Sequence, residues 1–347
     1  MEHKVIQNIY SNPVNVTYQD GTAYLGQIAD PTVIKGDDGF IYIFSTHGKM
    51  FKSEDGCNFK LVTERIFPLP TWGKEVGKKN SDYELWAPDI KKINDKWVMY
   101  YSLSGWGSPR GIGVAIADKI DGPYQDLGKL CSCEEIGVNN CIDPQVFIEN
   151  NKIYLVVGSF QGIFIFRLDQ TGTKLLSEKE NQNKILIAGR VSFWDGATYE
   201  GSYIIKKDGY YYYFGSVGTC LEGKNSTYHV VVGKSDNLFG PYVGKDNIPL
   251  TESGNGLTYG EVVVKVPFEK KDELAGVGHN SILIDDEDNY FIYYHGFSKL
   301  DNFKTRHLFM DKLLFDEQGY PYVKNFCPSF EEKNEGPVFK RKEDKYE

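Results

Sequence analysis

The chain lacks any apolar run of the roughly 18 residues that a membrane-spanning helix needs. Its first residues, Met1-Glu2-His3-Lys4, also lack the apolar stretch of a secretion signal. We therefore expect no membrane span. We also expect an intracellular protein, unless a signal has been removed, in which case the protein would be extracellular or periplasmic.

Positive charge is scarce as well. The chain has 39 Lys and Arg against 48 Asp and Glu, and its formal net charge is -9. Binding to nucleic acid needs Lys and Arg clustered on a basic surface, because that surface must neutralise phosphates. This balance argues against nucleic acid as a partner and favours a neutral ligand.

Cysteine is present without the spacing of a metal site. None of the six forms a Cys-x-x-Cys pair, which excludes the common zinc motifs. We expect free, buried thiols at Cys57, Cys131, Cys133, Cys141, Cys220 and Cys327. A bridge from Cys141 to Cys131 or Cys133 is the alternative, and it would indicate an oxidising compartment.

The chain does contain one short sequence motif, called the phrase below, in five copies. The copies begin at Asp30-Pro31, Ala87-Pro88, Asp143-Pro144, Glu200-Gly201 and His279-Asn280. The first three intervals are 57, 56 and 57 residues and the last is 79, which places the chain among repeat proteins.

Each phrase is followed by a turn signal and then by a β-rich run, such as Asn94-Asp95 before Trp97-Val98-Met99-Tyr100-Tyr101. Third strands follow, clearest at residues 111–116, 163–166 and 229–233. Repeats of this kind predict an all-β fold, a five-bladed β-propeller. We expect one domain over residues 1–347, with a core at about 20–325 and a charge-rich segment at about 330–347 that is a solvated tail or an outer-blade edge.

The innermost strands of a propeller line its central channel, so the leading residues of the five phrases should converge near the axis. Asp30, Asp143 and Glu200 would then form one acidic site. Three carboxylates suit metal binding or acid/base hydrolysis, and the absence of a calcium-loop motif favours hydrolysis. Glycoside cleavage needs one protonated acid, which releases the leaving oxygen, and one carboxylate, which activates water. A third acid can keep the pKa of the proton donor raised.

The chain also resembles glycoside hydrolase family 43 over roughly residues 25–325. The resemblance rests on Ala29-Asp30-Pro31-Thr32, Leu85-Trp86-Ala87-Pro88-Asp89-Ile90, Cys141-Ile142-Asp143-Pro144, Tyr199-Glu200-Gly201-Ser202, Gly278-His279-Asn280-Ser281 and the segment Arg306 to Leu313. It implies a five-bladed propeller that acts on arabinose- and xylose-containing polysaccharides with inversion. It also implies that Asp30 is the general base, that Glu200 is the general acid and that Asp143 orients the acid and raises its pKa.

Further residues follow from the same resemblance. It implies that His279 approaches a bound ion, often calcium, largely through water, and that Arg306 reaches the sugar pocket. No organic cofactor is expected. Trp86 and Ala87 are predicted to offer an apolar wall to a sugar ring, and Ser159 and Phe160 to contact the substrate. Trp72, Trp106 and Trp194 are further wall candidates.

The stretch from Ile142 to Ile163 is similar to arabinan-degrading members, as is Asn225 to Gly233. We therefore predict a monomeric hydrolase of oligo- or polysaccharides that cleaves 1,5-linked α-L-arabinan internally. Exo-acting α-L-arabinofuranosidase or β-xylosidase activity is the alternative within the family. A non-catalytic sugar-binding propeller is the alternative of another class. Invertase-like propellers are set aside, because their Asn-Asp-Pro-Asn phrase is not found here.

Overall fold

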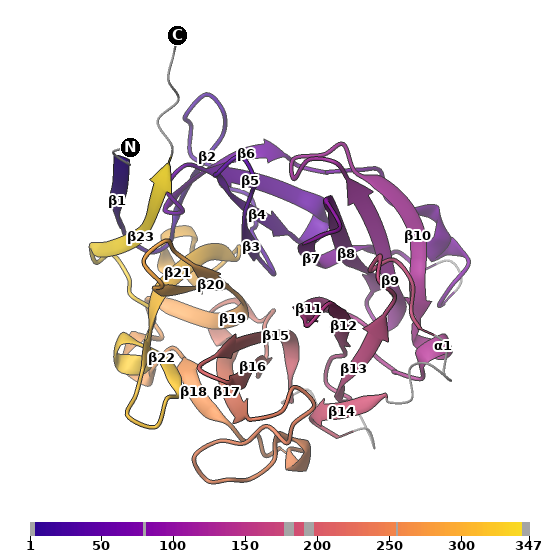
Figure 1. Cartoon of the computed structure of the whole chain (residues 1–347). Coiled ribbons are helices and arrows are strands. Elements are labelled where there is room, and N and C mark those ends of the chain that lie inside the picture. The colour runs from indigo at the N-terminus through magenta and orange to yellow at the C-terminus, as the bar shows by residue number, and fades with distance from the viewer. Residues whose placement is uncertain (1–3, 79–80, 177–183, 191–197, 255, 342–347) are drawn as a thin grey trace.

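Five β-sheets stand like blades around a central axis, as predicted (Figure 1). The structure is a computed structural model, and it describes residues 4–78, 81–176, 184–190, 198–254 and 256–341. No helix within these ranges is long and apolar enough to cross a membrane. The described residues contain a single α-helix, α1 (Cys133–Ile136), together with short 3-10 turns.

Each blade is an antiparallel meander made from one continuous segment of chain. The innermost strands are β3 (Thr32–Lys35), β7 (Glu84–Ile93), β11 (Gln145–Glu149), β15 (Glu200–Lys207) and β19 (Leu274–Ile284). The second strands are β4 (Ile41–Ser45), β8 (Lys96–Gly105), β12 (Lys152–Val157), β16 (Tyr210–Val217) and β20 (Tyr290–Ser298). The third strands are β5 (Lys49–Ser53), β9 (Ser108–Ala117), β13 (Ile163–Leu168), β17 (His229–Ser235) and β21 (His307–Phe315). The outer strands are β6 (Asn58–Thr63), β10 (Gln125–Ser132), β14 (Ile185–Ala188), β18 (Glu261–Val264) and β22 (Pro321–Val323).

The hairpins between first and second strands follow from turn chemistry. Asn94 and Asp95, and likewise Asn150 and Asn151, have positive φ at both positions of a two-residue loop. Asn and Asp tolerate this left-handed conformation, and its twist matches that of the flanking strands. The second strands that these turns lead into are buried along almost their whole length, as their β-rich runs predicted.

The core is divided among the interfaces between blades. Five large clusters of buried apolar side chains are present, and each joins two neighbouring blades. Burial of one large apolar side chain is worth about 1.5–3 kcal/mol. The ring is therefore held by its interfaces, and the blades keep a fixed arrangement around the axis.

The first and last described strands lie side by side, between the first and last blades (Figure 1). Strand β1 (Lys4–Tyr10) pairs with β23 (Asn334–Arg341) outside the ring, and β2 (Asn15–Thr17) adds to the first blade as a parallel outer strand. The segment expected to be a solvated tail or an outer-blade edge thus forms a strand as far as Arg341, with Phe339 fully buried.

The same backbone feature precedes the regularly paired part of every inner strand, within β7, β15 and β19 and just before β3 and β11. One residue takes a positive φ, between 40° and 59°, and regular pairing with the second strand resumes two residues later. These residues are Asp30, Ala87, Asp143, Gly201 and His279. The alignment of Glu200 with the other leading residues was therefore wrong by one residue, because in the fourth blade Gly201 takes the left-handed position. Glu200 instead matches Trp86, since both pair with a serine just before the bulge.

At four of the five junctions between neighbouring blades, this left-handed residue also forms a hydrogen bond to the preceding blade. In each, the main-chain N–H of the left-handed residue donates to a side chain near the end of the preceding second strand. The pairs are Asp30 to His295 Nδ1, Ala87 to Thr46 Oγ1, Asp143 to Ser102 Oγ and His279 to Ser216 Oγ, at 2.8–3.1 Å. These contacts fix the angular position of each leading residue around the axis.

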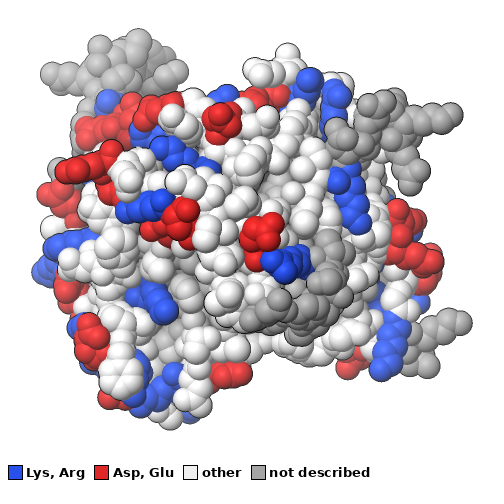
Figure 2. All heavy atoms as spheres, turned by 90° about the horizontal axis from the view of Figure 1, so that it is seen from below, with Lys and Arg blue, Asp and Glu red and all other residues white. Residues whose placement is uncertain are grey.

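Acidic and basic side chains are interspersed on the face shown in Figure 2, without a broad field of one sign. All six cysteines are free thiols, of which Cys57, Cys131 and Cys141 are buried and the others are half-buried. The thiols of Cys131 and Cys133 lie close to that of Cys141, so the three that entered the alternative prediction of a bridge are neighbours.

We expect Asn12→Ala to weaken the closure of the ring. The Asn12 amide donates to the carbonyl of Met310 at 2.7 Å and accepts from the N–H of Met310 at 2.9 Å. Its loss leaves buried main-chain groups unpaired, which should lower the free energy of unfolding by about 3 kcal/mol and reduce the Tm by several degrees. Asn15→Ala is the matched control, because the exposed Asn15 side chain contacts only Asn58. Equal thermal unfolding of the two variants would contradict this role of Asn12.

Candidate active site

A pocket of about 560 Å³ opens at the end of the channel where the inner strands begin. Asp30, Asp143 and Glu200 all line it, although they are far apart in the sequence. Ser159, Phe160, Trp86, His279 and Arg306 line it too. The structure thus brings these eight residues to one pocket, together with Trp106, whereas Ala87 and Trp72 do not line it.

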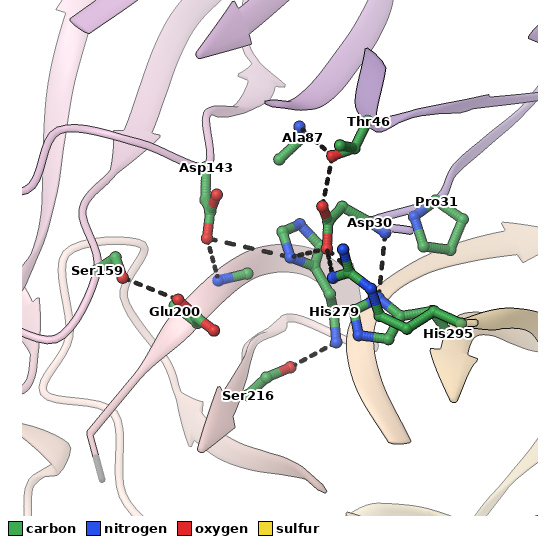
Figure 3. A network of polar contacts seen from close by, with 12 residues as sticks. Asp30, Pro31, Thr46, Ala87, Asp143, Ser159, Glu200, Ser216, His279 and His295 are labelled. Carbon is green, nitrogen blue, oxygen red and sulfur yellow. Dashed lines mark hydrogen bonds and ion pairs between the residues drawn. The ribbon is translucent and has the colours of Figure 1, made fainter. Parts of the chain in front are cut away.

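Asp30 is surrounded by groups that favour its charged form. It accepts a short hydrogen bond from the Thr46 hydroxyl, and its Oδ1 lies 3.4 Å from Arg306 Nη1 and 3.2 Å from His279 Nδ1 (Figure 3). Burial alone would raise the pKa of Asp30, but Arg306, the Thr46 hydroxyl and the imidazoles of His279 and His295, when these are protonated, outweigh it and hold that pKa well below its usual range. Asp30 is therefore an ionised carboxylate.

Asp143 and Glu200 have the opposite tendency. Burial, together with repulsion from Glu200 and Asp30, raises the pKa of Asp143 well above its usual range. Burial also raises the pKa of Glu200 to about 7, and this rise is opposed by the hydroxyls of Tyr228 and Ser159. At mildly acidic pH the site therefore holds an ionised Asp30 beside a protonated Glu200. Two acids whose pKa values are driven apart are the arrangement of a base and an acid.

Two hydrogen bonds fix these buried acids. The Ser159 hydroxyl donates to Glu200 Oε2 at 2.9 Å, and the main-chain N–H of Gly201 donates to Asp143 Oδ2 at 3.1 Å (Figure 3). The second strand of blade three and the inner strand of blade four therefore determine how the two carboxyls are presented to the pocket.

The two histidines near the axis are neutral close to pH 7, because burial lowers the pKa of His279 and of His295. His295 Nδ1 accepts from the N–H of Asp30, which puts the proton of the neutral ring on Nε2. The permanent positive charge beside Asp30 is consequently that of Arg306.

A cation beside His279 would find few direct ligands. Across the described ranges, no group of three or more His, Cys, Asp or Glu residues is placed to hold a metal ion. His279 Nδ1 already faces Asp30, and calcium prefers six to eight oxygens. The donor set does not fit a directly coordinated ion. The water-bound calcium ion near His279 stays a prediction, and no step below uses it.

The predicted wall is partly present. Trp86 lines the pocket and packs against Trp106, with ring centroids 5.6 Å apart, while the Trp106 side chain is 78% exposed at the rim. Ala87 does not form part of this wall. It is buried beside Thr46, to which its N–H donates, and it has only a methyl side chain where Asp30 and Asp143 carry carboxyls into the pocket.

Two further tryptophans, Trp72 and Trp194, were predicted as wall residues. Trp72 packs between blades one and two, where its ring N–H donates to Tyr101, so it belongs to the core. Trp194 lies outside the described residues.

Sequence reasoning missed Thr46, which binds Asp30, and His295, which accepts from its N–H. A signal was available. Thr46, Ser102, Ser216 and His295 are polar residues at one offset, two positions after the strand residue that first pairs beyond the bulge. These four residues recur at the same position of their blades, so the repeat could have pointed to them as it did to the leading residues.

Comparison with known proteins agrees with this geometry. The family profile described as Glycosyl hydrolases family 43 matches residues 24–321. The extracellular exo-alpha-(1->5)-L-arabinofuranosidase ArbA of Cellvibrio japonicus is 29% identical over 85% of this chain and 86% of its own length. The extracellular endo-alpha-(1->5)-L-arabinanase 1 of Bacillus subtilis is 33% identical over 65% of this chain and 70% of its own length.

A solved structure gives the same result. The alpha-L-arabinanase of Cellvibrio cellulosa complexed with arabinohexaose superposes with a TM-score of 0.73 at 27% identity, covering 86% of this chain and 96% of that one. The fold and the acidic pocket agree with the profile match. The chain therefore belongs to glycosyl hydrolase family 43 and is a glycosidase that hydrolyses O-glycosyl bonds.

Proposed function

We propose that the protein hydrolyses α-L-arabinofuranosidic linkages of 1,5-linked arabinan, with inversion and from within the polymer. The observation that carries the proposal is the pairing, in one pocket, of an ionised Asp30 with a Glu200 whose pKa is raised to about 7. The names of the arabinan-cleaving relatives support the choice of sugar.

In the proposed reaction Asp30 accepts a proton from a water molecule, and the water oxygen attacks the anomeric carbon. Glu200 transfers its proton to the glycosidic oxygen as the bond to that oxygen breaks, so charge is conserved. Arg306 and Thr46 keep Asp30 ionised and oriented until it accepts the proton. The attack and the departure occur on opposite faces of the sugar, which inverts its configuration without a covalent intermediate.

Asp143 is the modulator in this scheme. It is 6% exposed, and its carboxyl is held by the N–H of Gly201, the residue that follows Glu200. Burial and repulsion from Glu200 and Asp30 raise the pKa of Asp143, whereas burial and the charge of Asp30 raise that of Glu200, so Glu200 keeps its proton at the pH where Asp30 has lost its own. Asp143 would act on the acid by fixing the main chain at Gly201.

The rim of the pocket supports binding of more than one sugar. Trp86 and Trp106 form a paired aromatic surface beside the acids, and aromatic faces suit the apolar side of a furanose ring. Exo action is the second candidate, and it is supported by the name of the Cellvibrio japonicus relative.

Substitution of the acids tests the catalytic assignment. We expect Glu200→Gln and Asp30→Asn each to lower kcat on linear 1,5-arabinan by about 10² to 10⁴-fold, because each removes a proton-transfer step. Asp143→Asn should reduce kcat less, since that residue acts through Glu200. Release of reducing ends measures the rate, and thermal unfolding checks that each variant is folded. Full activity of Glu200→Gln would disprove the proposed acid.

The pH dependence follows from the same groups. Activity requires protonated Glu200, so kcat/KM should fall as the pH rises through about 7. Asp30 stays ionised far below neutrality, so it should give no acidic limb above about pH 4, where native protein can be assayed. Initial rates from about pH 4 to 9 give the profile. An optimum that persists to about pH 9 would contradict the role of Glu200.

Product analysis separates endo from exo action. A ladder of oligomers from linear arabinan is expected, whereas free arabinose alone would indicate exo action. Trp106→Ala should lower kcat/KM on the polymer by roughly tenfold and leave a single-sugar aryl arabinofuranoside nearly unaffected, because the lost stacking lies at the rim. Phe268→Ala is the matched control, since Phe268 is equally exposed, at 78%, but does not line the pocket. Equal losses on both substrates would contradict a rim subsite.

A further inference from the structure

The junction between blades three and four departs from the pattern of the other four. Elsewhere, a side chain at the end of the preceding second strand accepts from the N–H of the left-handed residue. Here the N–H of Gly201 donates to the carboxylate of Asp143 instead. At the corresponding position blade three has Gly158, which has no side chain to accept that N–H. The next residue, Ser159, contacts Glu200 instead.

The direction of this contact has a chemical consequence. A serine hydroxyl has one proton, and Ser159 donates it to Glu200 Oε2 at 2.9 Å. An oxygen that accepts such a bond is the carbonyl-like oxygen of a protonated carboxyl. The acid proton then resides on Oε1, the other oxygen. Ser159 is 1% exposed and Glu200 is 7% exposed, so water competes little for either group.

We propose that Ser159 is a positioning residue for the general acid, holding Glu200 Oε2 so that the proton on Oε1 meets the glycosidic oxygen. This inference rests on the proposed function, because it requires Glu200 to be the acid. It differs from the prediction that Ser159 binds substrate, because here its hydroxyl proton is committed to Glu200. The 2.9 Å contact and the burial of both side chains support it, as does the N–H of Gly201, which donates to Asp143 and leaves the Ser159 hydroxyl to Glu200.

Ser159 also affects the ionisation of Glu200. The groups that act on this carboxyl are the hydroxyls of Ser159 and Tyr228 and the charges of Asp30 and Arg306, with Asp143 and Cys220 close by. A hydrogen bond to the carboxylate lowers its pKa and so opposes the effect of burial. Removing the Ser159 hydroxyl should therefore raise the pKa of Glu200.

Ser159→Ala tests the proposal on the full chain. We expect kcat on linear arabinan to fall by roughly tenfold with little change in KM, and the alkaline limb of the pH profile to move up by about half a unit to one unit. The loss should be much smaller with 4-nitrophenyl arabinofuranoside, because nitrophenolate departs with little protonation. Ser159→Thr keeps a hydroxyl and should recover part of the rate.

Ser216→Ala is the comparison variant. Ser216 accepts from the N–H of His279 at 2.8 Å in the regular pattern, so its loss should lower the Tm and leave the alkaline limb in place. The proposal is overturned if Ser159→Ala leaves the alkaline limb unmoved, or if it raises KM alone, as loss of a sugar contact would. If Glu200→Gln is inactive while Ser159→Ala behaves as wild type, only this inference fails. If Glu200→Gln is active, both this inference and the proposed function fail.

Discussion

The site depends on one backbone constraint, the left-handed residue that precedes the regularly paired part of each inner strand. A positive φ at a non-glycine residue is unfavourable by about 1 kcal/mol or more, yet Asp30, Ala87, Asp143 and His279 all adopt it. The N–H bonds to the preceding blades offset this strain at these four positions. In return, residues separated by more than a hundred positions are brought to the axis at fixed angles, which flexible loops could not do.

Electrostatics then differentiates residues that share this geometry. Three carboxyls are buried around one permanent cation, Arg306, which lies beside Asp30. Asp30 therefore stays charged, while Asp143 and Glu200, further from compensating charge, favour their protonated forms. The lowered pKa values of the histidines matter here, because charged imidazoles beside Asp30 would add to the positive charge of Arg306 and favour ionised carboxyls in the pocket.

The five blades and the convergence of the acids could be predicted from sequence, because equivalent positions of the repeats recur at recognisable intervals along the chain. The exact register in the fourth blade could not. Glu200 and Gly201 both fit the phrase by type, and only strand pairing reveals that Gly201 is the left-handed residue. Ala87 was predicted as a wall residue but is buried, because a methyl group at the position that carries carboxyls in Asp30 and Asp143 does not reach the pocket. Thr46 and His295 were missed because their effect is exerted through contacts across blade junctions.

The shifted register explains how the reaction and the choice of substrate are separated. Trp86 and Glu200 occupy the same position in blades two and four, just before the bulge, so one site of the repeat supplies an aromatic wall in one blade and the acid in another. The acids lie on rigid strand starts and are braced by neighbouring blades. Trp106, by contrast, lies on an exposed turn between β8 and β9. Changes on that turn can alter how much of a chain is bound without moving the proposed proton donor, because among the described residues no hydrogen bond of the acidic trio runs through it.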